Sequence, residues 1–492
     1  MLDFDICYRA MASRDARFDG DFYVAVTTTG VYCRPVCGSR TPKPENVRFF
    51  RVPGAAEAAG FRACRRCRPD AAPSSREWNV RGDLVARALR LIASGAVDDI
   101  GVAGVARQLA VSERHLHRQL VAEVGVGPLA LAVNRRNQVA RLLIESSALP
   151  LADVAFASGY ASVRQFNDGM RAAFGCAPGQ LRGTRGGRGA YAGHGVHGVH
   201  GVPSHRSGPL VLRLRYRPPL DGAGLLAWLR ARAVAGVEKV EPERYRRTLR
   251  LPRGTGSAEF DLGASPSAAS PAQQGQVTLR LCLEDLRDVT AAVRRCRDLL
   301  DLDADPAAIA ESLGADPRLG ALVRATPGLR VPGCTDGFEL AVRMVAEQYA
   351  PLEDARKVCR QLVEHCGETV GVPGAEPDLL FPSARAVAES ALEAPGLDAH
   401  LTAALRGLAR AVADGELSLE RDADRDETTA RLNELPGIEA STVRRIRTHA
   451  LGDPDVLSLD SPAVRDMAAR SARWRPWRSY AVTHLIRASA LT

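Results

Sequence analysis

Four of the eleven cysteines lie close together near the N-terminus, and their spacing predicts chemistry. Three residues separate Cys33 from Cys37, and after 26 further residues Cys64 and Cys67 follow with two residues between them. Zinc binds four soft ligands in a tetrahedron, and close cysteine pairs on turns supply two ligands each with little backbone strain. The spacing therefore predicts a zinc site. The odd cysteine count in a chain without a signal segment argues against a disulfide framework and predicts a reducing, cytoplasmic location.

A four-cysteine zinc site is most often structural, but it can also react. Zinc keeps a bound sulfur deprotonated at neutral pH, so the thiolate can attack a soft electrophile. The residues around the cysteines would place such a site in a positive field facing DNA. Six of them are arginines: Arg34, Arg40, Arg62, Arg65, Arg66 and Arg68.

The charge distribution also indicates a polyanionic partner. Residues 1–190 contain 27 Arg and Lys and 17 Asp and Glu, whereas the remaining residues carry a net charge close to zero. A basic N-terminal half favours nucleic acid, although a basic protein without that role has the same composition. No apolar run is long enough to span a bilayer, so we expect no membrane association.

The elements that would position these residues form a mainly α, multidomain chain. A small α+β zinc domain is expected at 1–78. Two helix-turn-helix units follow at 80–183, with Ser112 and Ser162 as N-caps and a connecting helix at about 129–146. The Gly- and His-rich stretch 184–208 is predicted to be a flexible linker. An α+β subdomain at 209–290 and a helical domain at 291–492 complete the chain.

The N-terminal motif FYVAVTTTGVYCRPVCGSRTPKPENVRFF, followed by GFRACRRCRPD, resembles the N-terminal domain of Ada-type DNA repair proteins. The resemblance implies that Cys33 accepts a methyl group from a methylphosphotriester in DNA, while Cys37, Cys64 and Cys67 remain spectator ligands. Methylation would convert a thiolate to a thioether and reduce the formal charge of the site from −2 to −1. The methylated protein should then bind the phosphate backbone more tightly.

The paired helix-turn-helix pattern resembles the AraC-type DNA-binding domain. The resemblance implies recognition helices at about 112–123 and 162–174 in successive major grooves of double-stranded DNA. It also implies an activator that contacts RNA polymerase. The candidate DNA-contacting residues are Arg114, His115, Arg118, Arg164, Gln165 and Asn167. The alternative is that most of these polar residues simply form the solvent-exposed faces of their helices.

The C-terminal half resembles AlkA-type 3-methyladenine DNA glycosylases, through TPGLRVPGCTDGFELAVRMVAEQYAPLEDARKVCRQLV and ARWRPWRSYAVTHL. The resemblance implies a helix-hairpin-helix fold that flips an alkylated base out of DNA. Asp460 is the candidate for the catalytic carboxylate that stabilises the cationic sugar. Tyr349 falls where the family inserts a wedge into the duplex, and Gly437 falls in the hairpin turn that offers backbone N–H groups to phosphate.

Several residues depart from the glycosylase pattern. Glu439 replaces the second hairpin glycine, and an ungapped comparison places Ser461 rather than Asp460 at the catalytic position. Pocket aromatic residues, which would stack on a cationic base, are replaced by Ser441, Arg445 and Ile486. The Pro-Cys-His-Arg motif of O6-alkylguanine acceptors does not occur, so repair of that lesion is not predicted.

Three hypotheses remain open from the sequence. The leading one is a zinc methyl acceptor fused to a transcription activator and a glycosylase that excises bases such as 3-methyladenine. The second is a methylation-sensing regulator whose glycosylase-like domain is catalytically silent. The third is a zinc-containing transcription factor without methyl chemistry.

Overall fold

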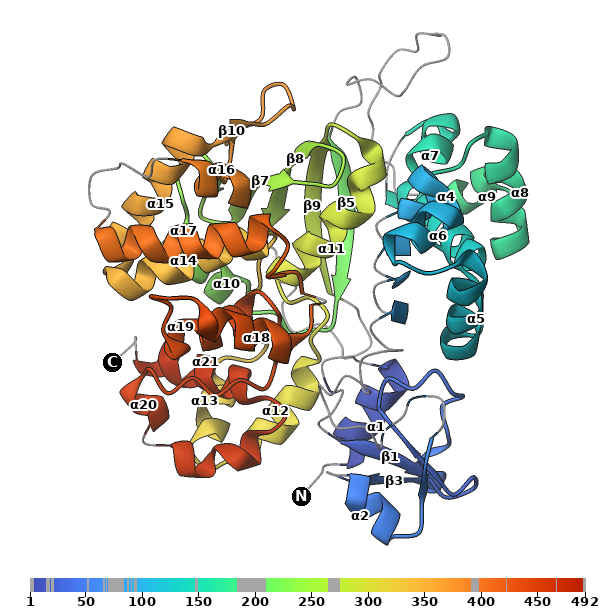
Figure 1. Cartoon of the computed structure of the whole chain (residues 1–492), viewed down its shortest axis with the longest axis horizontal. Helices are drawn as coiled ribbons and strands as arrows, with labels where there is room; N and C mark the ends of the chain where they lie inside the picture. Colours follow the sequence, from blue (N-terminus) through green and yellow to red (C-terminus); the bar gives the residue numbers. More distant parts are fainter. Residues whose placement is uncertain are drawn as a thin grey trace.

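The computed structural model shows an N-terminal module, a helix-turn-helix module and a larger C-terminal module (Figure 1). Among the residues described, no helix is long and apolar enough to cross a membrane. The predicted linker 184–208 and Arg65, Arg66 and Arg68 lie outside these residues. The structure describes residues 4–14, 18, 22–50, 53–64, 67, 69, 84–85, 88–89, 91–92, 95–146, 149–183, 209–263, 275–390, 398–421, 423–465 and 467–489.

The N-terminal module (residues 4–69) is a small four-stranded sheet flanked by helices. The strand order is β3-β1-β2-β4, with β1 antiparallel to β2 and β3, and β2 parallel to β4. Gly30 turns the chain between β1 and β2 with φ +63°, a conformation that glycine adopts at little cost. The elements are α1 (Phe4–Ser13), β1 (Tyr23–Val26), β2 (Val31–Cys33), a 3₁₀ helix (Pro44–Asn46), β3 (Val47–Phe50), α2 (Pro53–Ala58) and β4 (Arg62–Ala63).

The helix-turn-helix module (residues 95–183) contains the two predicted units. The Ser112 hydroxyl accepts a hydrogen bond from the His115 N–H, and the Ser162 hydroxyl accepts one from the Gln165 N–H, both at 3.2 Å. These caps begin the second helix of each unit, as the sequence predicts. The helices are α4 (Ala96–Gln108), α5 (Glu113–Val124), α6 (Pro128–Ser146), α7 (Leu151–Ala157), α8 (Val163–Phe174) and α9 (Pro178–Gly183).

The C-terminal module begins with a sheet subdomain, a five-stranded antiparallel sheet in the order β5-β9-β8-β7-β6. In β5 every second residue is buried, which gives the sheet an apolar inner face. This mixture of strands and a helix agrees with the α+β subdomain expected from the sequence. The elements are β5 (Leu210–Tyr216), α10 (Gly222–Arg232), β6 (Glu238–Val240), β7 (Arg244–Arg250), β8 (Thr255–Asp261) and β9 (Gly275–Leu283).

The rest of the C-terminal module is a helical domain that contains the short strand pair β10–β11 and a hairpin of α18 and α19. Its elements are a 3₁₀ helix (Leu286–Asp288), α11 (Val289–Leu299), α12 (Pro306–Gly314), α13 (Leu319–Ala325), α14 (Gly337–Tyr349), α15 (Leu352–Cys366), β10 (Glu368–Thr369), β11 (Leu379–Leu380), α16 (Ala384–Glu389), α17 (Ala399–Ala413), α18 (Arg425–Glu434), α19 (Ala440–His449), α20 (Pro462–Arg465), a 3₁₀ helix (Ala468–Trp474) and α21 (Arg478–Ser489).

A buried charge network joins α14 to the sheet subdomain. The Arg247 guanidinium donates to Glu339 at 2.7 Å, and Arg343 donates to Glu238 at 2.7 Å and also pairs with Glu339. All four side chains are less than a tenth exposed. Because each buried charge has an opposite partner, the network fixes the N-terminal part of α14 against the sheet. The C-terminal end of the same helix holds Tyr349.

Candidate metal centre and nucleic-acid interface

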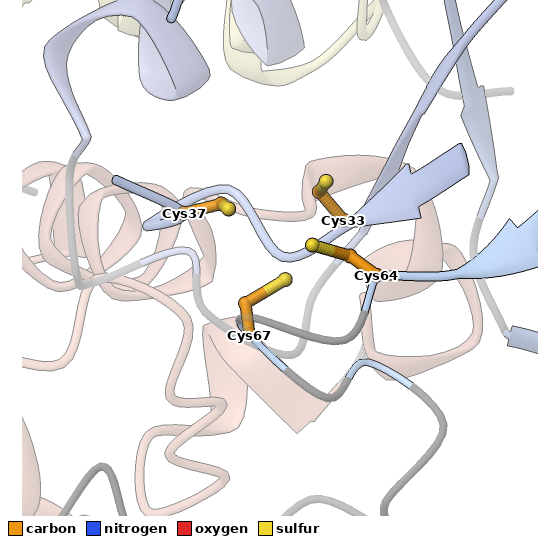
Figure 2. Close-up of side chains that lie close together, drawn as sticks. All are labelled: Cys33, Cys37, Cys64 and Cys67. Carbon is orange, nitrogen blue, oxygen red and sulfur yellow. The ribbon is translucent and has the colours of Figure 1, made fainter. Parts of the chain in front are cut away.

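The four N-terminal cysteines converge on one point. Cys33 is the last residue of β2, and Cys64 follows β4, which is paired with β2. All four sulfur atoms lie within 4.8 Å of one another, and Figure 2 shows the four side chains gathered in one place. Cys33, Cys37 and Cys67 are buried and Cys64 is half-buried. The predicted ligand set is therefore assembled by the fold.

The electrostatics of this cluster fit a divalent cation. Hydrogen bonding among the sulfurs raises the pKa of Cys33 and Cys67, lowers the pKa of Cys64, and lowers the pKa of Cys37 to about 6. Protonated thiols thus stabilise neighbouring thiolates, and four thiolates at this separation require a positive charge between them. A tetrahedral zinc ion supplies that charge, and these four residues would hold it.

A backbone donor contacts the cysteine cluster, and basic residues lie close to the ligands in the sequence. The Arg34 N–H donates to the Cys67 sulfur at 3.3 Å, which helps to stabilise a thiolate there. Of the predicted basic residues, Arg40 and Arg62 are exposed and Arg34 is half-buried. Arg48 of β3 is a further exposed arginine of this module and lies over the Phe50 ring at 5.2 Å. The described surface of the N-terminal module therefore carries positive charge, including Arg40 and Arg62, which are close in sequence to the ligand cysteines.

The predicted DNA-contacting residues lie on the second helix of each helix-turn-helix unit. In α5, Arg114 and Arg118 are exposed and His115 is half-buried, and Arg118 contacts the His115 Nδ1 at 3.1 Å. In α8, Arg164 and Gln165 are exposed and Asn167 is half-buried, whereas Phe166 and Met170 are buried. Apolar residues thus orient each helix so that its polar residues face solvent.

The hairpin between α18 and α19 is held by the end of α14. Gly437 has φ +81°, and a Cβ there would lie 2.8 Å from the Tyr349 hydroxyl. That hydroxyl and the Gln348 amide each donate to the Gly437 carbonyl at 2.8 Å, and the Glu439 N–H donates to the Gln348 Oε1 at 3.0 Å. Gln348 was missed by the sequence analysis, since only its neighbour Tyr349 matched a known role.

The remaining glycosylase candidates have partners within the chain. Arg444 donates to Asp460 at 3.2 Å, and both side chains are more than a third exposed. Arg445 pairs with Glu347, which also lies 3.3 Å from Arg232. A separate set, Glu439, Ser441, Ser461 and Ile486, is found at or near the surface, and the Ser441 hydroxyl donates to the Glu439 carboxylate at 3.2 Å.

Family comparisons match each module. The family described as metal binding domain of Ada matches residues 6–70, a helix-turn-helix domain matches residues 105–184, and the AlkA N-terminal domain matches residues 211–336. The fold and the cysteine cluster thus define a zinc-binding, DNA-binding protein of several domains.

Full-length comparison gives the family. The chain is 45% identical to a protein of Mycobacterium tuberculosis named as a probable bifunctional transcriptional activator/DNA repair enzyme AlkA, over 98% of this chain and 96% of that protein. The chain belongs to this family of bifunctional transcriptional activators and DNA repair enzymes, so DNA is the macromolecule on which it acts.

Two Escherichia coli proteins match separate parts of the chain. DNA-3-methyladenine glycosylase 2 is 30% identical over 55% of this chain and 95% of its own length. The bifunctional transcriptional activator/DNA repair enzyme Ada is 38% identical over 25% of this chain and 33% of its own length. A quarter of the chain and slightly more than half of it are therefore similar to two different repair proteins.

Proposed function

We propose that Cys33 irreversibly accepts a methyl group from a methylphosphotriester in the DNA backbone. The convergence of the four sulfurs in a domain of the Ada metal-binding family carries this proposal. A bond forms between the Cys33 sulfur and the methyl carbon as the bond from that carbon to the phosphate oxygen breaks. The phosphodiester leaves as an anion, so no general base is needed.

The four cysteines have two different roles in this reaction, since one reacts and three hold the metal. Bound zinc would keep sulfur in the thiolate form at neutral pH. Cys37, Cys64 and Cys67 hold the metal and remain unmodified, and pairing of β2 with β4 fixes Cys33 beside Cys64. Exposed Arg40 and Arg62 attract the phosphate backbone. The thioether product is stable, so each molecule acts once and its methylation reports the damage.

The helix-turn-helix module converts this report into gene activation. Arg114, His115 and Arg118 of α5 and Arg164, Gln165 and Asn167 of α8 contact DNA in successive major grooves. Arginine favours guanine, and glutamine or asparagine favours adenine. RNA polymerase is the partner that an activator of this type recruits, and the protein acts in the cytoplasm.

Methyl uptake from alkylated DNA tests the acceptor role. Duplex DNA carrying radiolabelled methylphosphotriesters should transfer one methyl group per molecule to the wild-type protein and none to Cys33→Ser. Cys176→Ser is the matched control because Cys176 lies in the helix-turn-helix module, and it should react like wild type. Uptake by Cys33→Ser equal to wild type would exclude Cys33 as the acceptor.

For the C-terminal module we propose excision of alkylated bases such as 3-methyladenine. Asp460 would stabilise the cationic sugar, Tyr349 would fill the gap in the duplex, and Gly437 would approach a phosphate. Specific contacts favour the alternative of a silent domain. Arg444 already engages Asp460, and the Arg445–Glu347 pair places charge where relatives stack a cationic base.

Base release decides between these two functions. If Asp460 is catalytic, Asp460→Asn should lose nearly all release of 3-methyladenine from alkylated duplex, while Asp426→Asn, an exposed ion-paired control on α18, should retain it. Release that survives in Asp460→Asn would exclude that residue as the catalyst. A wild-type protein that releases no base, yet takes up methyl groups, would establish the silent alternative.

A further inference from the structure

A polar junction attaches the helix-turn-helix module to the sheet subdomain. Arg253, in the turn between β7 and β8, lies between Asp99 of α4 and Asp288 near the start of α11. Its backbone N–H donates to Asp288 at 2.9 Å, and its guanidinium contacts Asp288 at 3.4 Å and pairs with Asp99. The Arg253 side chain is only 13% exposed, whereas Asp99 is 39% exposed, so the bridge between modules is shielded from solvent on the Arg253 side.

Apolar packing accompanies the Arg253 bridge. Helix α6 contacts β5, and α7 contacts the 3₁₀ helix Leu286–Asp288. One continuous hydrophobic core includes Leu143 and Val154 from the helix-turn-helix module and Leu212 from β5. The junction therefore combines a charge bridge with buried apolar surface, and the close packing of that surface defines one relative orientation.

A second junction attaches the N-terminal module to the helical domain. The Phe18 ring meets the Trp477 ring edge to face, with centroids 5.1 Å apart. Arg9 of α1 pairs with Glu311 of α12 at 3.0 Å. Buried residues of α1 belong to the same hydrophobic core as residues of α12, α13 and α21. In Figure 1 the C-terminal module lies beside both other modules.

Both junctions leave basic residues of the helix-turn-helix module exposed. Arg114 and Arg118 of α5 and Arg164 of α8 are exposed in the docked arrangement. The cysteine cluster is separate from the hydrophobic core that joins α1 to the helical domain. Docking therefore leaves these three arginines exposed, and its hydrophobic core does not include the four cysteines.

We propose that the C-terminal module is a platform that holds the methyl-acceptor module and the helix-turn-helix module in a fixed relative orientation for simultaneous DNA binding. The proposal rests on the DNA-binding roles proposed above, but it does not depend on base excision. When two DNA-binding modules are joined by a flexible connection, that connection limits the effective concentration of the second module once the first has bound. Fixing the relative orientation of the modules in advance removes part of the entropy cost of ordering them on the DNA. A platform role explains what a glycosylase-like module contributes even without a catalytic carboxylate.

Two substitutions that break the same ion pair but change the net charge in opposite directions test the platform. Arg253→Gln and Asp99→Asn each break the bridge, yet the first removes a positive charge and the second removes a negative charge. Affinity of the Cys33-methylated full-length protein for a mixed-sequence duplex would be measured by fluorescence anisotropy, and its dimensions by small-angle X-ray scattering. The double variant completes a cycle, and Arg250→Gln, which breaks a pair with Glu368 inside the C-terminal module, is the matched control.

The platform predicts the same sign for both single variants. Each should weaken duplex binding on the order of tenfold and increase the radius of gyration, and the double variant should be no weaker than either single variant. Arg250→Gln should do neither. Thermal unfolding of each variant confirms that its modules remain folded.

Other outcomes would overturn the proposal. Opposite signs would indicate a simple charge effect on DNA binding, and unchanged or tighter binding would show that the orientation is not used. Weaker binding without expansion would place the effect at the DNA contact rather than at the junction. Methyl uptake by each variant is measured in parallel. If the wild-type protein took up no methyl group, the acceptor function would be rejected. The small-angle scattering measurements on the two single variants and the double variant would still test the junction.

Phe18→Ala tests the second junction independently. It should expand the molecule and weaken duplex binding in the same way, whereas Phe50→Ala, which removes an aromatic contact with Phe61 in a separate cluster of the N-terminal module, should not. Zinc content confirms that the cysteine site of both variants is intact. A compact Phe18→Ala protein with wild-type affinity would overturn the platform for the methyl-acceptor module.

Discussion

The position of the Cys33 side chain has to suit two roles, that of a zinc ligand and that of the proposed methyl acceptor. As a ligand its sulfur must face the other three, and as an acceptor it must also meet the methyl carbon. Its position at the end of β2 satisfies the first requirement. The strand fixes the backbone before Cys33, and the loop that follows leads directly to the next ligand, Cys37. The ligand set was predictable because spacing alone selects four cysteines from eleven.

Residue roles that depend on long-range contacts could not be predicted. Gln348 holds the hairpin through two backbone groups that lie 89 and 91 positions away in the chain, and nothing in its local sequence indicates a partner. Similarly, Arg445 finds Glu347 only because α14 and α19 pack together. Periodicity specifies which face of a helix is buried, but it does not specify which polar groups meet across it.

A buried histidine predicts how stability depends on pH. Burial in α21 lowers the pKa of His484 to about 4, and the side chain also contacts the Thr326 hydroxyl at 3.1 Å. Because the unfolded chain takes up this proton at higher pH than the folded chain, stability is full above about pH 6.5 and falls as pH drops toward 4. We expect this residue to account for a loss of about 3 kcal/mol over that window.

Urea unfolding at several pH values measures this contribution. His484→Gln should be less stable than wild type at pH 7 and should show a smaller decrease between pH 6.5 and pH 4. An equally steep decrease in the variant would assign the pH dependence to other groups. His400 at the exposed start of α17 provides the matched control, because His400→Gln should leave the pH profile unchanged.

At the scale of elements, amphipathic helices and their caps were predictable, but polar strands were not. Ser112 and Ser162 marked the starts of α5 and α8 because their hydroxyl groups satisfy otherwise unpaired N–H groups. Strand β7, by contrast, contains four arginines in seven residues and lacks clear alternation of apolar side chains. Its pairing with β6 and β8 places it in the sheet.

The N-cap of α8 is predicted to contribute to the stability of the helix-turn-helix module. Ser162→Ala removes the acceptor for the Gln165 N–H, so it should destabilise the helix-turn-helix module by about 1 kcal/mol. Ser162→Asn retains a capping oxygen and should recover most of that loss. Chemical denaturation monitored by circular dichroism measures both, and equal stability of all three proteins would show that the cap contributes nothing.

At the scale of the whole molecule, the sequence predicted the modules but not how they dock. Each module has its own pattern of apolar residues, so its fold class follows from local periodicity. The junctions depend on single residues such as Arg253, Phe18 and Trp477, whose partners lie in distant parts of the chain. Their identification required the assembled structure.

Metal removal should affect one module selectively. A chelator should unfold the sheet around the cysteines, because four sulfurs without a cation cannot all remain thiolates at this separation. Hydrogen exchange should then become fast in β1 to β3 but remain slow in β7 to β9. Unchanged protection of β1 to β3 after complete zinc loss would show that the metal is not needed for the fold.

We propose that Cys33 is both a zinc ligand and the methyl acceptor, and peptide mass spectrometry decides whether it is. The full-length protein would first react with excess duplex containing methylphosphotriesters. We expect one added methyl group, located on Cys33, with Cys37, Cys64 and Cys67 unmodified. An unmodified Cys33, or a methyl group on another of the four cysteines, would refute the proposed acceptor role.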